Sequence, residues 1–362
     1  MRKLAAAIAG LAMLVASPAA AQTLTIDEAQ AAASVENLVD GFIRPGFANF
    51  AATAGKTAGA VGALCETPGA GSLQAARDAF RDSALAFAGV EFLRIGPLIQ
   101  DNRLERLLFW PDRRGIALRQ VQGAIAQEDE TVLDAANLPA KSVALQGFTA
   151  LEYLLFGTGS DALAGTGAAH RCGFAAAVSE NIHAIAQELD TAWADPQGFA
   201  AAWSHPGPDN AMFRNGEEVV SELLSIPSEA FEIIRDQRLK PVAPGDGDAN
   251  PKRALFWRSD LSVQFVGAGL EALRAYFNAA GIADLLPEDA RWQANSIAFE
   301  FNNAEATLSR LQMPVADILA DEERAGDLNY VIILTQSLQS LFGQQLTATL
   351  GLSVGFSSLD GD

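Results

Sequence analysis

The chain has 362 residues, 49% of them hydrophobic, with 44 acidic against 25 basic residues and a formal net charge of −19 at pH 7. This length accommodates one large or two ordinary domains at about 100–200 residues each. Binding to nucleic acid or to an anionic membrane surface requires a basic patch, so we predict no nucleic-acid partner for so acidic a chain; the charge favours solubility and could also attract cations.

The N-terminal segment, MRKLAAAIAGLAMLVASPAAAQ, has the pattern of a secretory signal peptide. Arg2 and Lys3 form a basic start, residues 4–16 are apolar, and Ala19 to Ala21 provide small residues for cleavage. The apolar core is shorter than the roughly 20 residues that cross a bilayer, and no cysteine follows it as a lipid anchor. We therefore predict a signal peptide over residues 1–21 and a periplasmic mature chain.

Most of the remaining chain has the helical period, because apolar residues recur three and four positions apart. Alternating strand patterns are scarce, so we predict an all-α protein. Pro227 is expected to kink or split the long amphipathic segment that contains it, and Gly281 to end another. The predicted helices span residues 73–93, 146–157, 174–193, 215–239, 253–281, 289–311 and 327–352.

Segments rich in Gly, Pro and Asp divide these helices into two groups. We predict two packed helical-bundle domains, an N-terminal one over residues 22–200 and a C-terminal one over residues 201–362. The segment 241–252 is the strongest linker candidate. The predicted loops span residues 67–72, 157–170, 195–210 and 241–252.

The two cysteines, Cys65 and Cys172, are an even number in a chain with an export signal. An oxidising compartment favours one disulfide between them, which would stabilise the fold by about 3–5 kcal/mol. Metal ligation by both is the alternative, but the pair lacks the close CxxC spacing of zinc sites.

Several enzyme motifs are absent from the sequence. None of the three histidines, His170, His183 and His205, is followed by Glu and a second His in the HExxH pattern, which excludes a zincin peptidase. The G-x-S-x-G nucleophile elbow and the phosphate-binding P-loop are absent as well.

The stretch QGFTALEYLLFG, residues 146–157, is apolar nearly all round, so we predict a buried helix. A buried Glu152 must be paired, metal-bound or protonated. Gly147 in a helix interior costs about 1 kcal/mol relative to Ala, so we expect another backbone or a ligand close to it. Two interpretations stay open: Glu152 is a structural residue paired with an arginine, or it belongs with Thr149 to a ligand-binding face.

The same stretch resembles the G-x-H-x-x-E signature of imelysin-like proteins, peptidase family M75. Other segments resemble the family in the same order, so the resemblance covers almost the whole mature chain. These segments are FIRPGFANF, GALCETP, FLRIGPL, FWPDRRG, HRC, FWRSDLSV and GFSSLDGD.

The resemblance implies an all-α fold of two helical bundles with a site between them. Many members are exported or surface-associated and iron-regulated, and relatives include periplasmic components of iron uptake. The peptidase label comes from an insulin-cleaving member. In this sequence Gly147 and Glu152 match the motif, whereas Thr149 replaces its histidine. A neutral hydroxyl is a weak ligand for transition metals, so this degenerate motif disfavours metallopeptidase activity.

The segment WRSD offers partners for Glu152 from the second bundle. We hypothesise that Arg258 pairs with Glu152 and that Ser259 and Asp260 line the same cleft; alternatively, Arg258 and Asp260 form a surface pair.

The resulting hypothesis is a non-proteolytic, exported binding component linked to iron or other metal acquisition. It would bind a metal ion or small ligand and could have a membrane-bound uptake partner. Glu152 is the one candidate metal ligand, iron or another divalent metal the candidate cofactor, and no catalytic residue is assigned. The alternatives are an M75-type metallopeptidase and a non-catalytic interaction module.

Overall fold

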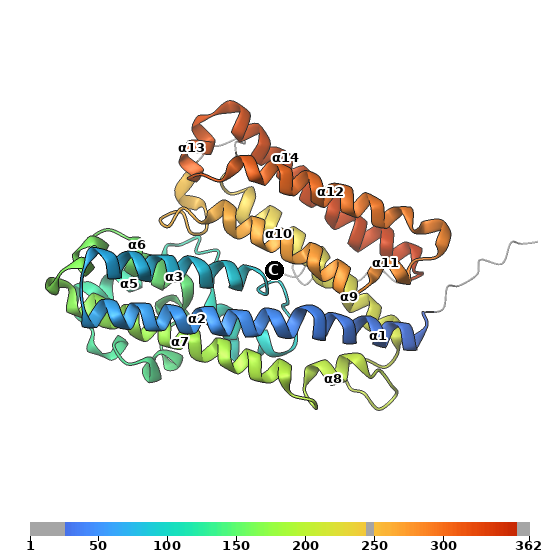
Figure 1. Cartoon of the computed structure of the whole chain (residues 1–362), viewed down its shortest axis with the longest axis horizontal. Coiled ribbons are helices and arrows are strands. Elements are labelled where there is room, and N and C mark those ends of the chain that lie inside the picture. Colours follow the sequence, from blue (N-terminus) through green and yellow to red (C-terminus); the bar gives the residue numbers. More distant parts are fainter. Residues whose placement is uncertain (1–25, 244–249, 353–362) are drawn as a thin grey trace, which may run out of the picture.

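The computed structural model describes residues 26–243 and 250–352, and these residues form helices and connecting turns without a strand (Figure 1). The predicted all-α fold of two packed helical bundles is confirmed. The predicted signal peptide lies outside the described residues. None of the described helices is long and apolar enough to cross a membrane.

The first bundle is built on the long helix α2, which packs against α3 and α7, with the short helix α6 against α3, α5 and α7. Its core contains a cluster of aromatic rings in which Phe148 of α6 meets Phe50, Phe80 and Phe87. The helices are α1 (Glu28–Leu38), α2 (Arg44–Glu66), α3 (Ala70–Ala88), α4 (Arg103–Leu107), α5 (Ile116–Ala126), α6 (Gly147–Phe156), α7 (Ala169–Ala194) and α8 (Phe199–Ser204).

The second bundle lies across the first, and in it α12 packs against α10 and α14, while α9 packs against α14 (Figure 1). Phe342 centres its aromatic core, with Phe231 and Phe277 next to it. The helices are α9 (Gly216–Ile233), α10 (Ser262–Ala279), α11 (Ile282–Leu285), α12 (Trp292–Leu308), α13 (Val315–Ala320), α14 (Glu322–Ser340) and α15 (Thr347–Thr349).

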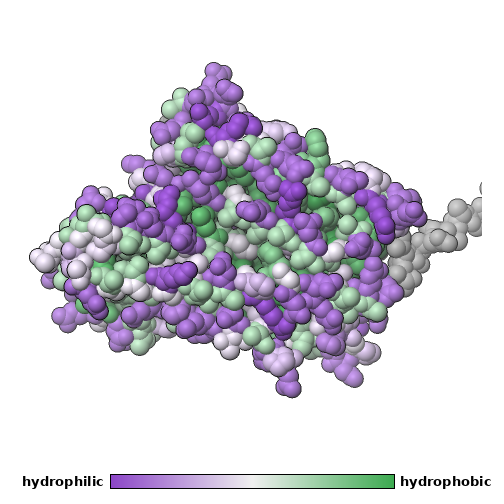
Figure 2. Space-filling view, viewed as in Figure 1, coloured by the Kyte–Doolittle hydropathy of each residue, from purple (hydrophilic) through white to green (hydrophobic). Residues whose placement is uncertain are grey.

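The two bundles share one continuous buried core. Helix α10 packs on α3, and α1 packs on α9. Phe256 links the aromatic cluster of the first bundle to helix α10 of the second, because its ring lies 5.8 Å from that of Phe80 and 5.2 Å from that of Phe265 in α10. In the space-filling view, hydrophilic residues cover the projecting end near α13, and apolar residues gather where the bundles meet (Figure 2).

A buried ion pair also crosses between the bundles. Arg238, which follows α9, lies 3.3 Å from each carboxylate oxygen of Glu91, and Arg94 lies 3.3 Å from the same carboxylate. Burial alone would raise the pKa of Glu91, but the charges of Arg238 and Arg94 outweigh burial and lower it. Glu91 is therefore held ionised inside the interface.

The predicted disulfide is present and closes the first bundle. It joins Cys65, near the end of α2, to Cys172, near the start of α7, with a Cα–Cα distance of 5.5 Å and a sequence separation of 107 residues. It therefore fixes the two most extensively paired helices of this bundle to each other at one end.

Most predicted helices have other ends in the structure; the helix predicted over 73–93, for example, is α3 and ends at Ala88. Two further segments differ within their length. The segment 253–281 becomes helical only at Ser262, because Phe256 and Asp260 adopt left-handed backbone angles, with φ of 59° and 56°. Residues 254–261 instead form a compact turn. The predicted split at Pro227 does not occur, because α9 runs unbroken through it. The carbonyl of Leu223, which has no N–H partner at Pro227, instead accepts a hydrogen bond of 3.0 Å from the Tyr276 hydroxyl.

The division after residue 200 stays a prediction. In the structure, residues 199–204 form α8, which packs on α1 and α7. The chain passes from the first bundle to the second between α8 and α9, over residues 205–215.

Candidate functional site

Helix α6 begins at Gly147 because only glycine fits there. Its φ is +70°, a left-handed angle, and a Cβ at this position would lie 2.3 Å from the carbonyl oxygen of Leu107 and 2.5 Å from that of Arg106. The expectation of a close backbone is thus met, whereas the placement of Gly147 inside the helix is wrong: it is the first helical residue. Its role here is to let the helix start against another chain segment.

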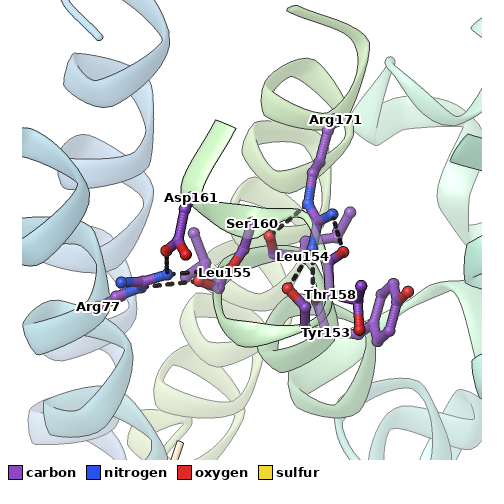
Figure 3. Close-up of polar contacts among 9 residues, drawn as sticks. Arg77, Tyr153, Leu154, Leu155, Thr158, Ser160, Asp161 and Arg171 are labelled. Atoms are coloured by element: carbon purple, nitrogen blue, oxygen red, sulfur yellow. Dashed lines mark hydrogen bonds and ion pairs between the residues drawn. The ribbon is translucent and has the colours of Figure 1, made fainter. Parts of the chain in front are cut away.

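The other end of α6 is held by two arginines from neighbouring helices (Figure 3). Arg171 donates hydrogen bonds to the carbonyls of Tyr153 and Leu154 at 2.6 and 2.8 Å, and Arg77 donates to the carbonyl of Leu155 at 2.9 Å. The last carbonyls of a helix have no partner within it. The Tyr153 carbonyl already accepts the Gly157 N–H, so the guanidinium groups supply the donors that are missing at Leu154 and Leu155. Helix α6 is therefore fixed at both ends.

Glu152 lies in the middle of α6 and is only 3% exposed. Its Oε1 accepts three hydrogen bonds of 3.0 Å, from the backbone N–H groups of Arg258 and Ser259 and from the Ser259 hydroxyl. Its Oε2 lies 3.9 Å from the Arg258 guanidinium. Burial raises the pKa of Glu152, and the Arg258 charge and the Ser259 hydrogen bonds oppose that rise.

These contacts place most of the predicted site residues together. Glu152, Arg258 and Ser259 are in direct contact, and Thr149 lies one helical turn before Glu152. Asp260 is exposed, and in the described part of the chain it forms no hydrogen bond or ion pair with Glu152. Whether these residues bind a ligand stays a prediction.

A cavity of about 480 Å³ opens beside Glu152. Its walls come from both halves of the sequence: the segment 109–121, helix α6, the segment 236–241 and the turn at 252–258. Thr149 Oγ1 is buried here and has no hydrogen-bond partner in the described part of the chain. The aromatic lining residues are Phe109, Trp110, Tyr153, Phe256 and Trp257, and the basic ones are Arg113, Lys252, Arg253 and Arg258.

Sequence reasoning placed Arg258 here and overlooked the other basic and the aromatic lining residues. Part of the signal was available, because the segments FWPDRRG and FWRSDLSV both combine aromatic residues with arginines. Lys252 is the last residue of the predicted linker 241–252. The overlooked residues come from segments that are distant in sequence, so their meeting at one cavity depends on how the bundles pack.

The Arg258 side chain is held in the cavity wall by aromatic rings. Its guanidinium carbon lies 4.4 Å from the ring centroid of Trp257 and 5.3 Å from that of Tyr153, distances at which a cation is attracted to an aromatic face. The hydroxyl of Tyr153 in turn accepts a hydrogen bond of 3.0 Å from Gln122. Arg258 is therefore oriented before any ligand arrives.

The other acidic residues of the lining are engaged in local contacts. Asp112 accepts hydrogen bonds from the backbone N–H groups of Ile116 and Ala117 and so caps the start of α5. Asp236 pairs with Arg235 and Lys240, both outside the lining. Neither of these two carboxylates forms an ion pair with a basic residue of the cavity lining.

The donor atoms of this cavity do not suit a bare transition-metal ion. Across residues 26–243 and 250–352 no group of three or more His, Cys, Asp and Glu could hold a metal ion, and none of the three histidines lines the cavity. Transition metals favour imidazole and thiolate ligands. Glu152 offers a carboxylate, but its Oε1 already accepts three hydrogen bonds and Arg258 faces its Oε2.

Comparisons with known proteins give one matching family model and two solved structures of similar fold. The model of the imelysin family, peptidase M75, matches residues 43–341. An imelysin-like protein from Psychrobacter arcticum is similar in structure, with a TM-score of 0.75, 18% identity, and coverage of 92% of this chain and 99% of that one. An iron-regulated protein A precursor from Parabacteroides distasonis has a TM-score of 0.74, 16% identity, and coverage of 89% and 96%. No curated protein matches.

Proposed function

This chain belongs to the imelysin family, and we propose that it is an exported, non-proteolytic binding component of iron or other metal acquisition. Its ligand occupies the cavity between the two bundles, beside Glu152. A membrane-bound uptake partner would complete such a pathway.

The cavity supports a binding role. Its volume of about 480 Å³ lies within the range of about 300–1,000 Å³ that small-molecule sites occupy. Aromatic rings form much of the wall, and a few polar groups converge on it from Thr149, Tyr153 and Arg258. This combination of apolar surface and few polar groups is typical of sites that bind small molecules.

The hydrogen bonds to Glu152 carry the argument against proteolysis. A metallopeptidase needs protein ligands that leave an open metal position, and a carboxylate free to act as a base. Here one oxygen of Glu152 accepts three hydrogen bonds from the turn at 258–259, and Thr149 stands where the family motif has histidine. Glu152 therefore serves to hold the turn.

The link to metal acquisition rests on the iron-related relatives that the family resemblance implies and on the Parabacteroides neighbour, whose name describes it as iron-regulated. Because the donor set does not suit a bare ion, the cargo is a metal that keeps its own organic ligands. The cavity then contacts the organic part of the complex, and no protein atom needs to coordinate the metal.

The test is a titration of Fe²⁺, Fe³⁺, Zn²⁺, ferric citrate and haem into the purified protein, followed by tryptophan fluorescence, to which Trp110 and Trp257 of the lining contribute. We expect at least one iron complex to bind and the bare ions not to bind in the cavity. The Thr149→Phe variant, which fills the cavity without changing its charge, is expected to abolish that binding.

Two outcomes would overturn the proposal. Binding of every iron compound with unchanged affinity by Thr149→Phe would show that the cavity is not the site. Cleavage of a protein substrate that stops on addition of a chelator would favour the M75 metallopeptidase.

A further inference from the structure

Within this proposed function, on which the inference rests, we infer that the cavity selects an anion carrying a flat ring system. The basic residues of the lining recognise carboxylate or phosphate groups of the ligand, and the aromatic wall recognises its ring.

The charge of the lining is opposite to that of the protein. The cavity holds four of the 25 basic residues of the chain and three of its 44 acidic residues. Asp112 caps α5 and Asp236 pairs with Arg235, so neither neutralises a basic residue of the lining. Of the three acidic lining residues, Glu152 is the one that lies beside a basic lining residue, Arg258. A lining that is basic within an acidic protein attracts anions and repels cations at the site.

Three of these cations lie at the mouth of the cavity. Arg113, Lys252 and Arg253 are exposed, and in the described residues none of them has a carboxylate within ion-pair distance. Their exposure lets them steer an approaching anion and pair with it at the rim.

The inner wall fits a planar group next to an acidic one. The guanidinium carbon of Arg258 lies 4.4 Å from the Trp257 ring centroid and 5.3 Å from that of Tyr153. Arg258 also lines the cavity, where a guanidinium can bind a ligand carboxylate through charge-assisted hydrogen bonds. The rings of Trp110, Tyr153 and Trp257 offer faces for stacking. Thr149 Oγ1 adds a hydroxyl without a protein partner among the described residues.

Other ligand classes fit less well. A small inorganic anion would leave the aromatic wall unmatched. A cationic ring could stack on the aromatic faces, but it would meet four positive side chains. A neutral ring would leave the basic groups without a function in binding.

The test compares three probes with the intact protein: 2-naphthoate, 2-naphthylmethylammonium and cyclohexanecarboxylate. The first two share a ring system and differ in charge, whereas the first and third share a carboxylate and differ in flatness. We expect 2-naphthoate to bind at least tenfold more tightly than either of the others, and its affinity to fall as salt is added.

Charge is tested at the rim, where side chains are exposed and substitution leaves the fold intact. We expect Lys252→Ala and Arg253→Ala each to weaken 2-naphthoate binding about two- to fivefold, the range of an exposed ion pair. The matched controls are Lys56→Ala and Arg291→Ala, which remove exposed cations that do not line the cavity; these should leave the affinity unchanged.

Equal binding of the ammonium and carboxylate probes, or unchanged affinity in the double variant Lys252→Ala/Arg253→Ala, would overturn the inference. The proposed function fails separately. If 2-naphthoate binds as expected and no iron complex binds, metal acquisition is wrong and the ligand class stands. If iron complexes bind in the cavity with the same affinity in Lys252→Ala and Arg253→Ala as in the wild type, the ligand class is wrong and the proposed function stands.

Discussion

Replacement of Glu152 separates its role as a hydrogen-bond acceptor from its charge. Glu152→Ala removes the acceptor, while Glu152→Gln keeps a carbonyl oxygen at the same position and removes the charge. In the protein, Oε1 of Glu152 holds the N–H groups of Arg258 and Ser259. The turn needs this support, because Phe256 and Asp260 adopt left-handed angles that cost an ordinary residue about 1–2 kcal/mol each.

The expected cost follows from the groups left without partners. The Ser259 N–H is buried and the Arg258 N–H is partly buried, and an unsatisfied buried donor costs about 1–3 kcal/mol. The Ser259 hydroxyl can still donate to the carbonyl of Phe256, 3.2 Å away. Because the adjoining cavity admits water to the Arg258 N–H, we expect Glu152→Ala to lose about 2–4 kcal/mol and Glu152→Gln about 1 kcal/mol.

The assay is urea unfolding followed by circular dichroism, with both variants measured beside the wild type at several pH values. Burial raises the pKa of Glu152 above its usual value of 4.5, so the folded protein binds this proton more tightly than the unfolded chain does. The stabilisation that comes from this tighter proton binding at Glu152 is fully present below pH 4.5 and is lost as the pH rises through the raised pKa. The difference between wild type and Glu152→Gln should follow that trend. Equal stability of the Ala and Gln variants would refute the acceptor role.

Three further predictions concern other contacts. Gly147→Ala should lower stability by more than about 4 kcal/mol, because its Cβ meets the Leu107 carbonyl at 2.3 Å; Gly123→Ala, with open space around it in α5, should be neutral or stabilising in the same thermal melts. Glu91→Gln should cost about 3–5 kcal/mol at neutral pH by leaving Arg238 unpaired. Since the pKa of Glu91 is lowered, its stabilisation is lost as the pH falls below 4.5, and wild type and variant should converge in acid unfolding. The disulfide joins residues that are 107 positions apart in the sequence, so its reduction should lower the free energy of unfolding by about 3–5 kcal/mol. Urea unfolding with and without reductant measures this difference.

The sequence predicted the fold well because helical periodicity is a local property. Helix α6 was predicted nearly as it stands, since its apolar residues surround it completely. The start of α10 was missed because the apolar residues of 254–261 continue the helical pattern, whereas Phe256 and Asp260 adopt left-handed angles and the turn between them donates hydrogen bonds to Glu152. That contact joins residues more than a hundred positions apart, which local periodicity does not report.

The candidate site was predicted in part for the same reason. The contact between Glu152 and the segment WRSD followed from two polar interruptions in apolar sequence, each of which needs a partner when buried. The basic rim gave no such signal, because exposed lysines and arginines are ordinary in any sequence. Arg113 and Arg253 can be assigned to one site only after packing has brought the segments 109–121 and 252–258 to the same cavity.

The structure also explains how this chain can retain two residues of the G-x-H-x-x-E motif without the third. Gly147 is needed for the backbone contact with Leu107, and Glu152 is needed for the turn that carries Trp257 and Arg258. Neither requirement involves a metal. A histidine at position 149 would add a ligand but no part of this framework, so Thr149 leaves the framework intact. Gly147 and Glu152 therefore have structural roles in this chain that need no metal, and Thr149 takes no part in those roles.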